Sequence, residues 1–562
     1  MEYLLIKKYY CCFNIEFLYG EIMEKKTMMI IGAVAAIIVI AVAAFTLMGG
    51  STDNDPTHLT VAAHSNIKEP KSGFDPLTGW GCGHQNYNPL VQSCLFKTDK
   101  KGEIVPDLAT GYSISGDGKT WTVNLRNDVK FSDNSTFNAK DVETTFNTAK
   151  KTETDLDLTN LEKVTAKNDT CVEFTLVEPR STFIYDLRYV GIVPEEYDNN
   201  TYGGNPIGTG PYVLDHWDKG QQAIFKVNDN YYGDKPYFTQ ITLLFPEEST
   251  WLELAKSGQV DVVPVATSAL NQTVDGYQFV EKSAGRAQGV SFPYLEDTGN
   301  VTNESGWKIG NNVTADKAIR QALNVGVDRQ KMCDEVFAGH ATPEYTSVDT
   351  RDYANQAAKV QDGNIDEAKR ILKEGGWEDT NGDGIVEKDG VKASFDLYYP
   401  PDYLDRQSLS TVFAEQAKEI GIEVNLKGAD WDTIYANMYS SAALMQQTSP
   451  DPYKSIYQQY HSKDADEFYM NPGLYNNTES DKLMEDAMHS TDFNTADTLW
   501  AESALVNGGG WGPAGDAPFA WLVNYDYNYF IKDGIDIGEQ PDGLGNDVLI
   551  NICDWTRTNS TA

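Results

Sequence analysis

Positive charge is scarce in this chain. Its 45 Lys and Arg residues stand against 83 Asp and Glu residues, which gives a formal net charge of −38. Such a surface repels polyanions and keeps a protein in solution, so nucleic acid is excluded as a partner. Signatures of catalysis are also missing: the sequence contains no HExxH, no Gly-x-Ser-x-Gly and no pair of His residues at metal-ligand spacing. Nothing in these patterns supports an enzyme.

Cysteine is sparse as well, and no Cys-x-x-Cys pair occurs. Five of the seven Cys residues lie beyond the first 50 residues, which is an odd number. One disulfide is feasible in an oxidising compartment, with Cys82 and Cys94 nearest to each other, but the sequence does not assign it. The five are Cys82, Cys94, Cys171, Cys333 and Cys553.

One long apolar run stands near the N-terminus. Residues Met28–Met48 are uncharged and mostly Ile, Val, Ala and Met, and they are numerous enough to span a bilayer core. Lys25 and Lys26 precede the run and Asp53 and Asp55 follow it, which orients its N-terminal end toward the cytoplasm. We therefore predict a cell-membrane protein with a single N-terminal transmembrane helix, whose body is extracytoplasmic.

A cleaved signal peptide is the alternative for this run, because it shares the Lys-rich start. The run is longer than the ~7–15 apolar residues of a typical signal, so an uncleaved anchor is favoured. Residues 1–27 would then be a cytoplasmic leader, of which 1–22 are made only if translation starts upstream of Met23. Residues 49–57 would form a short tether.

The body after the tether has the pattern of an α/β protein. Leu59–Ala63 has the composition of a buried strand, and residues 393–426 follow the order strand, helix, strand, with the helix at 406–420. This βαβ unit predicts a parallel sheet, whose ligands lie beyond the carboxyl ends of its strands. A further strand predicted at 442–447 therefore places Thr448–Tyr453 where a binding site is expected.

Two short patterns mark helix starts. Asn138 with Asp141 begins one helix, and Thr250 with Glu253 has the spacing of a capping box for a second helix at 251–257. In a capping box, the two side chains accept hydrogen bonds from backbone N–H groups that the first turn leaves unpaired.

The segment 379–390 resembles a calcium-binding loop. Asp379, Asn381 and Asp383 place oxygen ligands at alternate positions, and a glycine occupies the sixth position, where such a loop turns sharply. The twelfth position is Gly390 instead of a bidentate Glu, so a plain turn into the next strand is favoured. The alternative is a structural Ca²⁺ ion held by the three named residues.

Two isolated His residues and several aromatic residues are further candidates. His84 lies in the loop after the first strand, and His461 follows the expected binding site, so each is a candidate ligand of a metal or a metal chelate. Trp80, Tyr87 and Tyr453 are candidate walls of a pocket, because aromatic rings combine contact area with a polar tip. A surface or core role is the more common alternative for any single residue of these types.

Several blocks, in a fixed order, make the chain resemble one family. Asn205–Tyr212 reads Asn-Pro-Ile-Gly-Thr-Gly-Pro-Tyr, Asn228–Pro236 follows it, and Ala517–Leu522 comes last. With Ile104–Ala109 and Ala318–Asn324, these blocks resemble the extracellular solute-binding proteins of the peptide/nickel ABC importer family, known as bacterial solute-binding family 5. The resemblance covers the whole body after the tether.

This resemblance implies a two-lobed periplasmic-binding-protein-like fold of type II, with an extra third domain and a ligand cleft between the lobes. Such lobes close around the solute by a hinge motion, and the closed form docks on the permease. The implied limits are 58–95, 204–285 and 517–562 for lobe one, 96–203 for the extra domain and 286–516 for lobe two.

The resemblance also bears on the solute. Peptide-binding members usually carry an Asp about three residues before an acidic-Pro pair, where it holds the amino group of the peptide. Here the pair is Asp451-Pro452 and that position is Thr448, and a buried ammonium without a carboxylate partner is costly. Nickel-type members carry a His after the pair and an Arg in the extra domain, and His461 and Arg188 stand near these places. A Ni²⁺ chelate or another small polar solute is therefore favoured over long peptides.

Together these features predict a non-enzymatic receptor subunit of an ABC importer. Its partners would be the permease and, through it, the ATPase subunits, together with a small solute and the membrane, and no cofactor would be required. Two alternatives stay open: a membrane-anchored surface hydrolase and a surface-layer protein, which would need a catalytic group or repeats that the sequence does not display. The predicted ligand-binding residues are Trp80, His84, Tyr87, Arg188, Thr448, Asp451, Tyr453 and His461.

Overall fold

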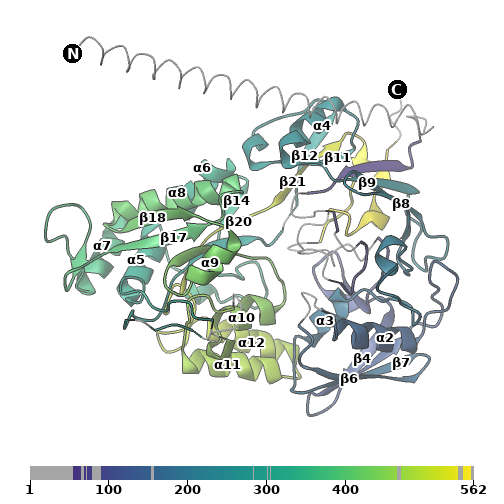
Figure 1. Cartoon of the computed structure of the whole chain (residues 1–562), viewed down its shortest axis with the longest axis horizontal. Coiled ribbons are helices and arrows are strands. Elements are labelled where there is room, and N and C mark those ends of the chain that lie inside the picture. Colours follow the sequence, from purple (N-terminus) through teal and green to yellow (C-terminus); the bar gives the residue numbers. More distant parts are fainter. Residues whose placement is uncertain are drawn as a thin grey trace, which may run out of the picture. The chain divides into compact units, whose positions relative to one another are not determined.

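The structure, a computed structural model, describes residues 55–64, 69–70, 73–78, 90–152, 157–282, 284–299, 301–303, 305–464, 470–541 and 548–558 (Figure 1). The predicted transmembrane segment 28–48 lies outside these residues, as do Trp80, His84 and Tyr87. Within the described ranges, no helix is long and apolar enough to cross a membrane. The chain divides into the units Met1–His58 and Leu59–Ala562, and everything below concerns the second unit and the strand that enters it.

The first large sheet has seven strands in the order β12-β21-β11-β1-β10-β9-β8, and we call it, with the segments that cover it, lobe one. Its strand β1 (His58–Ala62) confirms the strand predicted at 59–63 and pairs in parallel with β11 (Val262–Pro264). The apolar residues Leu59, Val61 and Ala62 of β1 are buried, as are all three residues of β11, which is expected inside a sheet covered on two faces. The other strands are β8 (Tyr212–Asp218), β9 (Gln222–Val227), β10 (Gln240–Leu244), β12 (Tyr277–Lys282) and β21 (Tyr527–Lys532).

The helix α4 (Trp251–Ser257) packs against β11 and begins where the sequence predicts. Its predicted capping box is wrong. Thr250 has helical backbone angles, and its Oγ1 donates a hydrogen bond of 2.7 Å to the carbonyl oxygen of Glu247. The reason is that a 3-10 turn at Glu248–Thr250 leads directly into α4, so Thr250 already belongs to a helical turn.

The extra domain is built on a four-stranded antiparallel sheet in the order β4-β5-β7-β6. The helix α2 (Ala139–Ala149) packs against this sheet, and its predicted start is confirmed: Asn138 accepts a hydrogen bond from the backbone of Lys140, and Asp141 accepts one from Asn138, each 2.8 Å long. Sheet and helix enclose a hydrophobic core of their own. The remaining elements are β4 (Ala109–Ile114), β5 (Thr120–Leu125), β6 (Leu161–Asn168), β7 (Cys171–Leu176) and α3 (Phe183–Tyr189).

The second large sheet has six strands in the order β14-β20-β13-β19-β17-β18 and defines lobe two. The predicted βαβ unit is confirmed, because β17 (Ser394–Tyr399) and β18 (Glu423–Gly428) pair in parallel and are joined by α8 (Leu404–Glu419). The predicted strand at 442–447 is confirmed as β19 (Ala442–Gln447), which is also parallel to β17. The other strands are β13 (Ala287–Ser291), β14 (Ala341–Pro343) and β20 (Phe519–Tyr525).

Helices cover lobe two and three small two-stranded sheets complete the fold. The helices are α5 (Lys317–Gly326), α6 (Arg329–Phe337), α7 (Ile365–Glu374), α9 (Trp431–Asn437), α10 (Gln458–Tyr460), α11 (Thr478–His489) and α12 (Phe493–Ser503). The small sheets pair β2 (Phe96–Thr98) with β3 (Ile104–Pro106), β15 (Glu387–Lys388) with β16 (Val391–Lys392), and β22 (Ile535–Asp536) with β23 (Thr556–Arg557).

Arg329 is a fully buried charge that ties α6 to the sheet of lobe two. Its Nε donates to the carbonyl oxygens of Trp521 at 2.7 Å and Glu344 at 2.9 Å, and its Nη1 donates to the carbonyl oxygen of Asn324 at 2.9 Å. Asp362 lies 3.2 Å from the same Nη1. The guanidinium therefore joins its own helix to the end of α5, to the segments at Glu344 and Asp362 and to the distant strand β20, and its charge is paired where it is buried.

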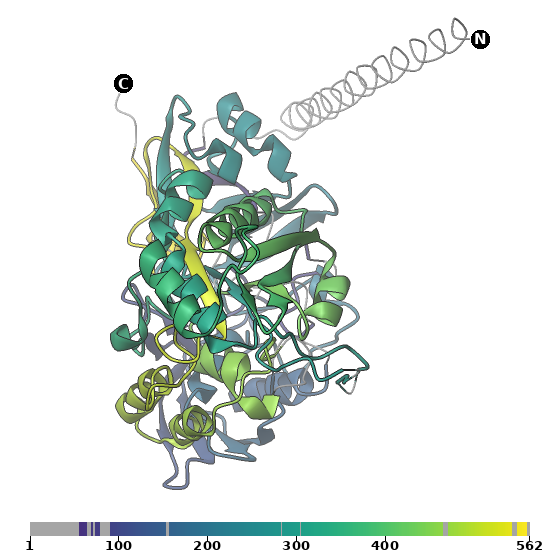
Figure 2. The ribbon, with the colours of Figure 1, turned by 90° about the vertical axis from the view of Figure 1, so that its left-hand side faces the viewer.

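The chain passes between the two large sheets twice. The first passage runs from Lys282 to Ala287, and the second runs from Tyr525 to Tyr527, within the long yellow ribbon in Figure 2. The implied start of the last lobe-one segment at residue 517 is therefore wrong, because β20 belongs to the sheet of lobe two. The reason is that β20 and β21 form one buried run interrupted only by Asp526. No turn or change of composition in the sequence therefore indicates where the chain leaves one sheet for the other.

Candidate functional site

The carboxyl ends of the parallel strands β17, β18 and β19 lie at one edge of the sheet of lobe two. The helix α8 begins just after β17, and Gln446 lies next to the end of β19. Ligands of α/β sheets bind at this edge, so its polar side chains are the first candidates for a site.

Arg406 is the central side chain of this edge. It lies in the first turn of α8, is buried, and is flanked by the rings of Tyr403 and Trp431, whose centroids are 4.7 and 5.3 Å from the guanidinium carbon. Its Nη2 donates a hydrogen bond of 2.9 Å to Oε1 of Gln446. Its Nε and Nη1 are buried and have no hydrogen-bond partner. A guanidinium held in this way is prepared to donate to an oxygen acceptor such as a carboxylate.

A second buried guanidinium converges on the same acceptor. Arg286 precedes β13 and donates from Nε to Oε1 of Gln446 at 3.3 Å. Its guanidinium carbon lies 4.2 Å from the ring centroid of Tyr525 and 4.8 Å from that of Tyr527, on either side of the second passage between the sheets. The positive charge of this edge is therefore placed beside the hinge.

The hydroxyl of Tyr525 is fixed by two neighbours of these arginines. It donates a hydrogen bond of 2.6 Å to Oδ2 of Asp405 and accepts one of 2.7 Å from Nε2 of Gln288. Among the described residues, Asp405 is the only carboxylate that is hydrogen-bonded within the cluster of Arg286, Arg406, Gln446 and Tyr525. The cluster therefore contains one carboxylate and two guanidinium groups. The cluster keeps a positive charge that a solute anion can balance.

Lobe one contributes His64, which follows β1. Its ring lies against Trp251 and Tyr527, with centroids 5.0 and 4.6 Å apart. Burial, and then the charge of Arg286, hold the pKa of His64 well below its usual range, so the imidazole is neutral at pH 7. The candidate site thus combines side chains from both lobes around the hinge, and the sequence alone did not single out His64, Arg286, Arg406 or Gln446.

The predicted segment Thr448–Tyr453 follows directly from this edge. Its shape is set by Gln447, whose Oε1 accepts hydrogen bonds from the backbone of Thr448 at 2.8 Å and Ser449 at 2.7 Å. The Nε2 of Gln447 donates to the carbonyl oxygen of Lys454 at 3.0 Å. One buried amide therefore closes the loop and leaves the Thr448 side chain half-buried at its start.

Arg188 lies in α3 of the extra domain and faces the same segment. Its Nη1 donates a hydrogen bond of 3.1 Å to Oγ1 of Thr98, and its Nε is buried without a hydrogen-bond partner. Burial lowers the pKa of Arg188. The negative charge of Asp451 is one of the interactions that raise this pKa and so oppose the effect of burial. The structure therefore brings two of the predicted residues into one electrostatic neighbourhood.

Asp451 and Tyr453 are engaged by the extra domain. The Oδ2 of Asp451 lies 3.7 Å from Nη2 of Arg180, and burial raises the pKa of this carboxyl although Arg180 opposes the shift. The hydroxyl of Tyr453 donates a hydrogen bond of 2.7 Å to Oδ2 of Asp157, and the Arg180 guanidinium lies 4.3 Å from the centroid of its ring. A cavity of about 230 Å³ borders this contact; its walls include Asp157, Asn160, Arg180, Tyr453, Tyr457 and Lys463.

His461 lies farther along lobe two. Its ring stacks on Tyr457 with centroids 4.2 Å apart, and its Nδ1 accepts a hydrogen bond of 3.1 Å from the backbone of Lys463. Its Nε2 lies 3.4 Å from Oε1 of Glu485, and burial lowers its pKa against the opposing charges of Asp481 and Glu485. Only Nε2 is left to bind a metal, so contact with a chelate stays a prediction.

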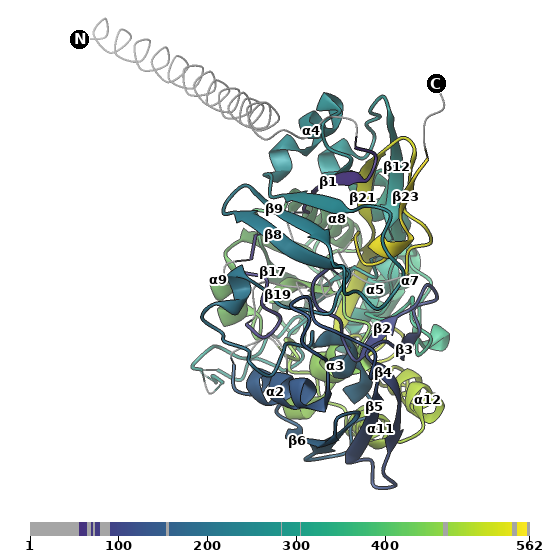
Figure 3. The same ribbon diagram turned by 90° about the vertical axis from the view of Figure 1, so that its right-hand side faces the viewer.

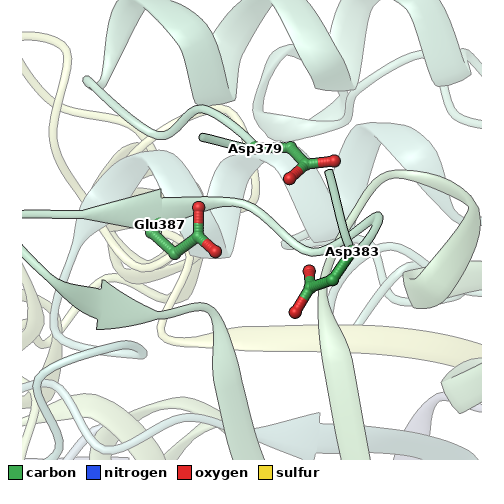
Figure 4. A group of neighbouring side chains, drawn as sticks. All are labelled: Asp379, Asp383 and Glu387. Carbon is green, nitrogen blue, oxygen red and sulfur yellow. The ribbon is translucent and has the colours of Figure 1, made fainter. Parts of the chain in front are cut away.

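The predicted calcium-like loop is drawn in Figure 4. Carboxylate oxygens of Asp379, Asp383 and Glu387 lie within 4.8 Å of one another, so the structure adds Glu387, at the ninth position, to the predicted set. The amide of Asn381 donates a hydrogen bond to Glu387, and its Oδ1 accepts one of 2.8 Å from the backbone of Asp383, so its role as an ion ligand stays a prediction. The Nζ of Lys392 lies 3.3 Å from Asp383 and already supplies a positive charge.

Two lobes joined by two chain passages, with an extra domain, define a protein of the type II periplasmic-binding-protein class. Residues 103–467 match the sequence model of bacterial extracellular solute-binding proteins, family 5 (middle region), and the chain belongs to this family. It is 31% identical to Protein XP55 of Streptomyces lividans over 481 aligned residues. The aligned region covers 82% of this chain and 83% of that protein.

Two further similar proteins have names or titles that say what they bind. The oligopeptide-binding protein AppA of Bacillus subtilis is 28% identical over 429 residues, 72% of this chain and 76% of that protein. The crystal structure of NikZ from Campylobacter jejuni in complex with Ni(L-His) superposes with a TM-score of 0.72 at 21% identity, covering 90% of this chain and 100% of that one. The second similarity establishes the fold alone.

Proposed function

We propose that this chain is the solute receptor of an ABC importer and that its solute carries a carboxylate. The receptor would capture the solute between lobes one and two and deliver it to the permease without changing it chemically. The observation that carries the proposal is the buried Arg406 guanidinium, which has two N–H groups without partners beside a second guanidinium.

An unpartnered buried donor costs about 1–3 kcal/mol, and more when it is charged. A carboxylate oxygen placed at Arg406 would remove this cost, so closure around an anionic solute is favoured over closure around a neutral one. Both peptides and metal chelates of amino acids carry such a carboxylate, which is consistent with the ligands named for AppA and NikZ.

The choice between these classes rests on the segment after β19. Thr448 stands where peptide-binding members place the Asp that holds an amino group, so a free ammonium would lack its partner there. We therefore favour a Ni²⁺ chelate or another small polar acid over a long peptide. In that case Arg188 would be a candidate partner of the anionic chelate, and Nε2 of His461 a candidate metal ligand.

The segment 28–48 would tether the receptor near its permease. An uncleaved anchor keeps the solute-loaded form at the membrane surface, which raises its effective concentration at the transporter. The Asp379 loop has no part in this function and would at most hold a structural ion.

The proposal is tested by thermal unfolding of the full chain in detergent with Ni²⁺, Ni²⁺ plus histidine, dipeptides and tripeptides. A solute at a hundred times its Kd adds about 2.7 kcal/mol to the unfolding free energy, which is a clear shift in Tm. We expect a shift with Ni²⁺ plus histidine that exceeds any shift with Ni²⁺ alone. No shift with any of these solutes, together with hydrolysis of the peptides, would replace the receptor by the surface hydrolase.

A further inference from the structure

The extra domain touches lobe two at a place that is separate from the Arg406 cluster. Figures 1 and 3 show the strands of the extra domain beside α11 and α12. Its hydrogen bonds and ion pairs join residues 157–181 of the extra domain to two parts of lobe two, the segment 451–453 and the end of α11.

Ser181 holds the end of α11. Its backbone N–H donates a hydrogen bond of 2.7 Å to the carbonyl oxygen of Met488, and its Oγ donates one of 2.9 Å to the carbonyl oxygen of Ala487. The last carbonyl groups of a helix have no partner inside the helix. Ser181 donates to two of them from another domain: the carbonyl oxygen of Met488, and that of Ala487, which also accepts a hydrogen bond of 3.2 Å from the backbone N–H of Ser490.

The second part is the contact of Tyr453 and Asp451 with the extra domain. Tyr453 reaches Asp157 through its hydroxyl, at 2.7 Å, and its ring lies beneath Arg180. Arg180 is about 4% exposed, and its Nη1 lies 3.1 Å from Asp186 while its Nη2 lies 3.7 Å from Asp451. One buried guanidinium is therefore shared between a carboxylate of its own domain and a carboxylate of lobe two.

The extra domain is fixed to lobe one by a different set of hydrogen bonds. The hydroxyl of Tyr232 donates to Oδ1 of Asp107 at 2.7 Å, and Nδ2 of Asn230 donates to the carbonyl oxygen of Phe131 at 2.9 Å. Tyr232 and Asn230 follow β9 of lobe one, while Asp107 and Phe131 belong to the extra domain side. A rotation at the two passages between the sheets would therefore carry the extra domain with lobe one and separate it from lobe two.

We propose that Ser181, the Tyr453–Asp157 hydrogen bond and the Arg180–Asp451 ion pair form an interlobe latch that holds the receptor closed in the absence of solute. The latch raises the affinity for the solute without touching it, because apparent affinity scales with the fraction of receptor already in the binding-competent form. The effect on solute affinity rests on the proposed function, whereas the effect of the latch on domain closure does not. Asp451 and Tyr453, expected to contact the solute, act in this account through the position of the domains.

The test uses the conservative variants Tyr453→Phe and Asp157→Asn, each of which removes one hydrogen bond across the latch. Tyr345→Phe is the matched control, since the hydroxyl of Tyr345 donates to Asp362 within lobe two at 3.1 Å. Small-angle X-ray scattering of the full chain in a contrast-matched nanodisc, without solute, measures closure, and calorimetry with Ni²⁺ plus histidine measures affinity.

We expect the two latch variants to have a larger radius of gyration than the wild type, and about tenfold weaker binding, with no change for Tyr345→Phe. An unchanged radius of gyration in both latch variants overturns the latch, whether or not affinity falls, because an affinity loss alone would mark a solute contact. If Ni²⁺ plus histidine does not bind any variant, the scattering result still decides the latch, and the failure then belongs to the proposed solute.

Discussion

Gln446 accepts hydrogen bonds from two arginines at one oxygen, 2.9 Å from Nη2 of Arg406 and 3.3 Å from Nε of Arg286. A neutral amide oxygen cannot balance two guanidinium charges, and Asp405 offers only one negative charge nearby. The hydrogen-bonded cluster around Gln446 and Tyr525 therefore holds two guanidinium groups and one carboxylate, in a chain whose net charge is −38. This local reversal of sign is the physical reason to expect an anionic solute.

Arg329 is expected to be necessary for the stability of lobe two. Replacing Arg329 by Met leaves the carbonyl oxygens of Trp521, Glu344 and Asn324 without their donor, and should lower the unfolding free energy by about 3–5 kcal/mol. The control Arg370→Met removes an exposed residue of α7 and should change the unfolding free energy far less than Arg329→Met does. Urea unfolding compares the two, and equal losses would contradict the structural role of Arg329.

Glu344 predicts how stability depends on pH. Burial, and then the charge of Asp349, raise the pKa of Glu344 to about 8, whereas the unfolded chain has a value near ~4.3. Between these values the folded chain binds more protons than the unfolded chain, so this residue's contribution is complete below about pH 4 and is lost as the pH rises through 8.

The variant Glu344→Gln cannot ionise and should therefore lose less stability between pH 5 and pH 8 than the wild type. Urea unfolding at the two pH values measures the difference. Glu335→Gln, at an exposed site of α6, is the control and should behave as the wild type does. The same loss in Glu344→Gln and wild type would show that Glu344 ionises normally in the folded chain.

The Asp379 loop is expected to bind Ca²⁺ only in the millimolar range. Gly390 supplies no side-chain ligand at the twelfth position, and Lys392 competes for Asp383. The variant Lys392→Met should bind Ca²⁺ more tightly, and Asp379→Asn should abolish the remaining binding, both measured by calorimetry. Micromolar binding by the wild type would make the loop a genuine structural calcium site.

The N-terminal anchor is tested on the mature protein. We expect mass spectrometry of the membrane fraction to find the segment 28–48 still attached, with the chain beginning at Met1 or Met23. Deletion of 28–48 behind a cleavable signal should release the body from the membrane. A mature protein that begins beyond Gly49 would mean that the segment is a signal peptide.

Much of the fold could be predicted because local patterns and packing agree. The βαβ unit at 393–426 and the helix after Asn138 have strong apolar patterns with clear ends, and both occur where the sequence predicts them. Thr250 shows the limit of such reasoning, because the turn before it is helical and cancels the capping signal. The passage at Asp526 could not be predicted, since both flanking strands are buried alike.

The site was predicted only in part, for a related reason. The rule that directs attention to Thr448–Tyr453, the residues beyond a parallel strand, applies equally to the start of α8 after β17, and would have found Arg406. The same rule applies to His64, which follows the parallel strand β1, whereas Arg286 has no such signal, because it precedes its strand and its partners are assembled only by the tertiary fold.

The most direct test of the account is a pair of solutes that differ only in charge. The full chain is titrated by calorimetry with histidine plus Ni²⁺ and with histidinamide plus Ni²⁺. The titrations are repeated with Arg406→Gln and with the control Arg126→Gln, a half-buried residue of the extra domain paired with Asp128. We predict that the wild type and the control bind the acid at least tenfold more tightly than the amide, and that Arg406→Gln loses this preference. Equal binding of acid and amide by the wild type would contradict the account.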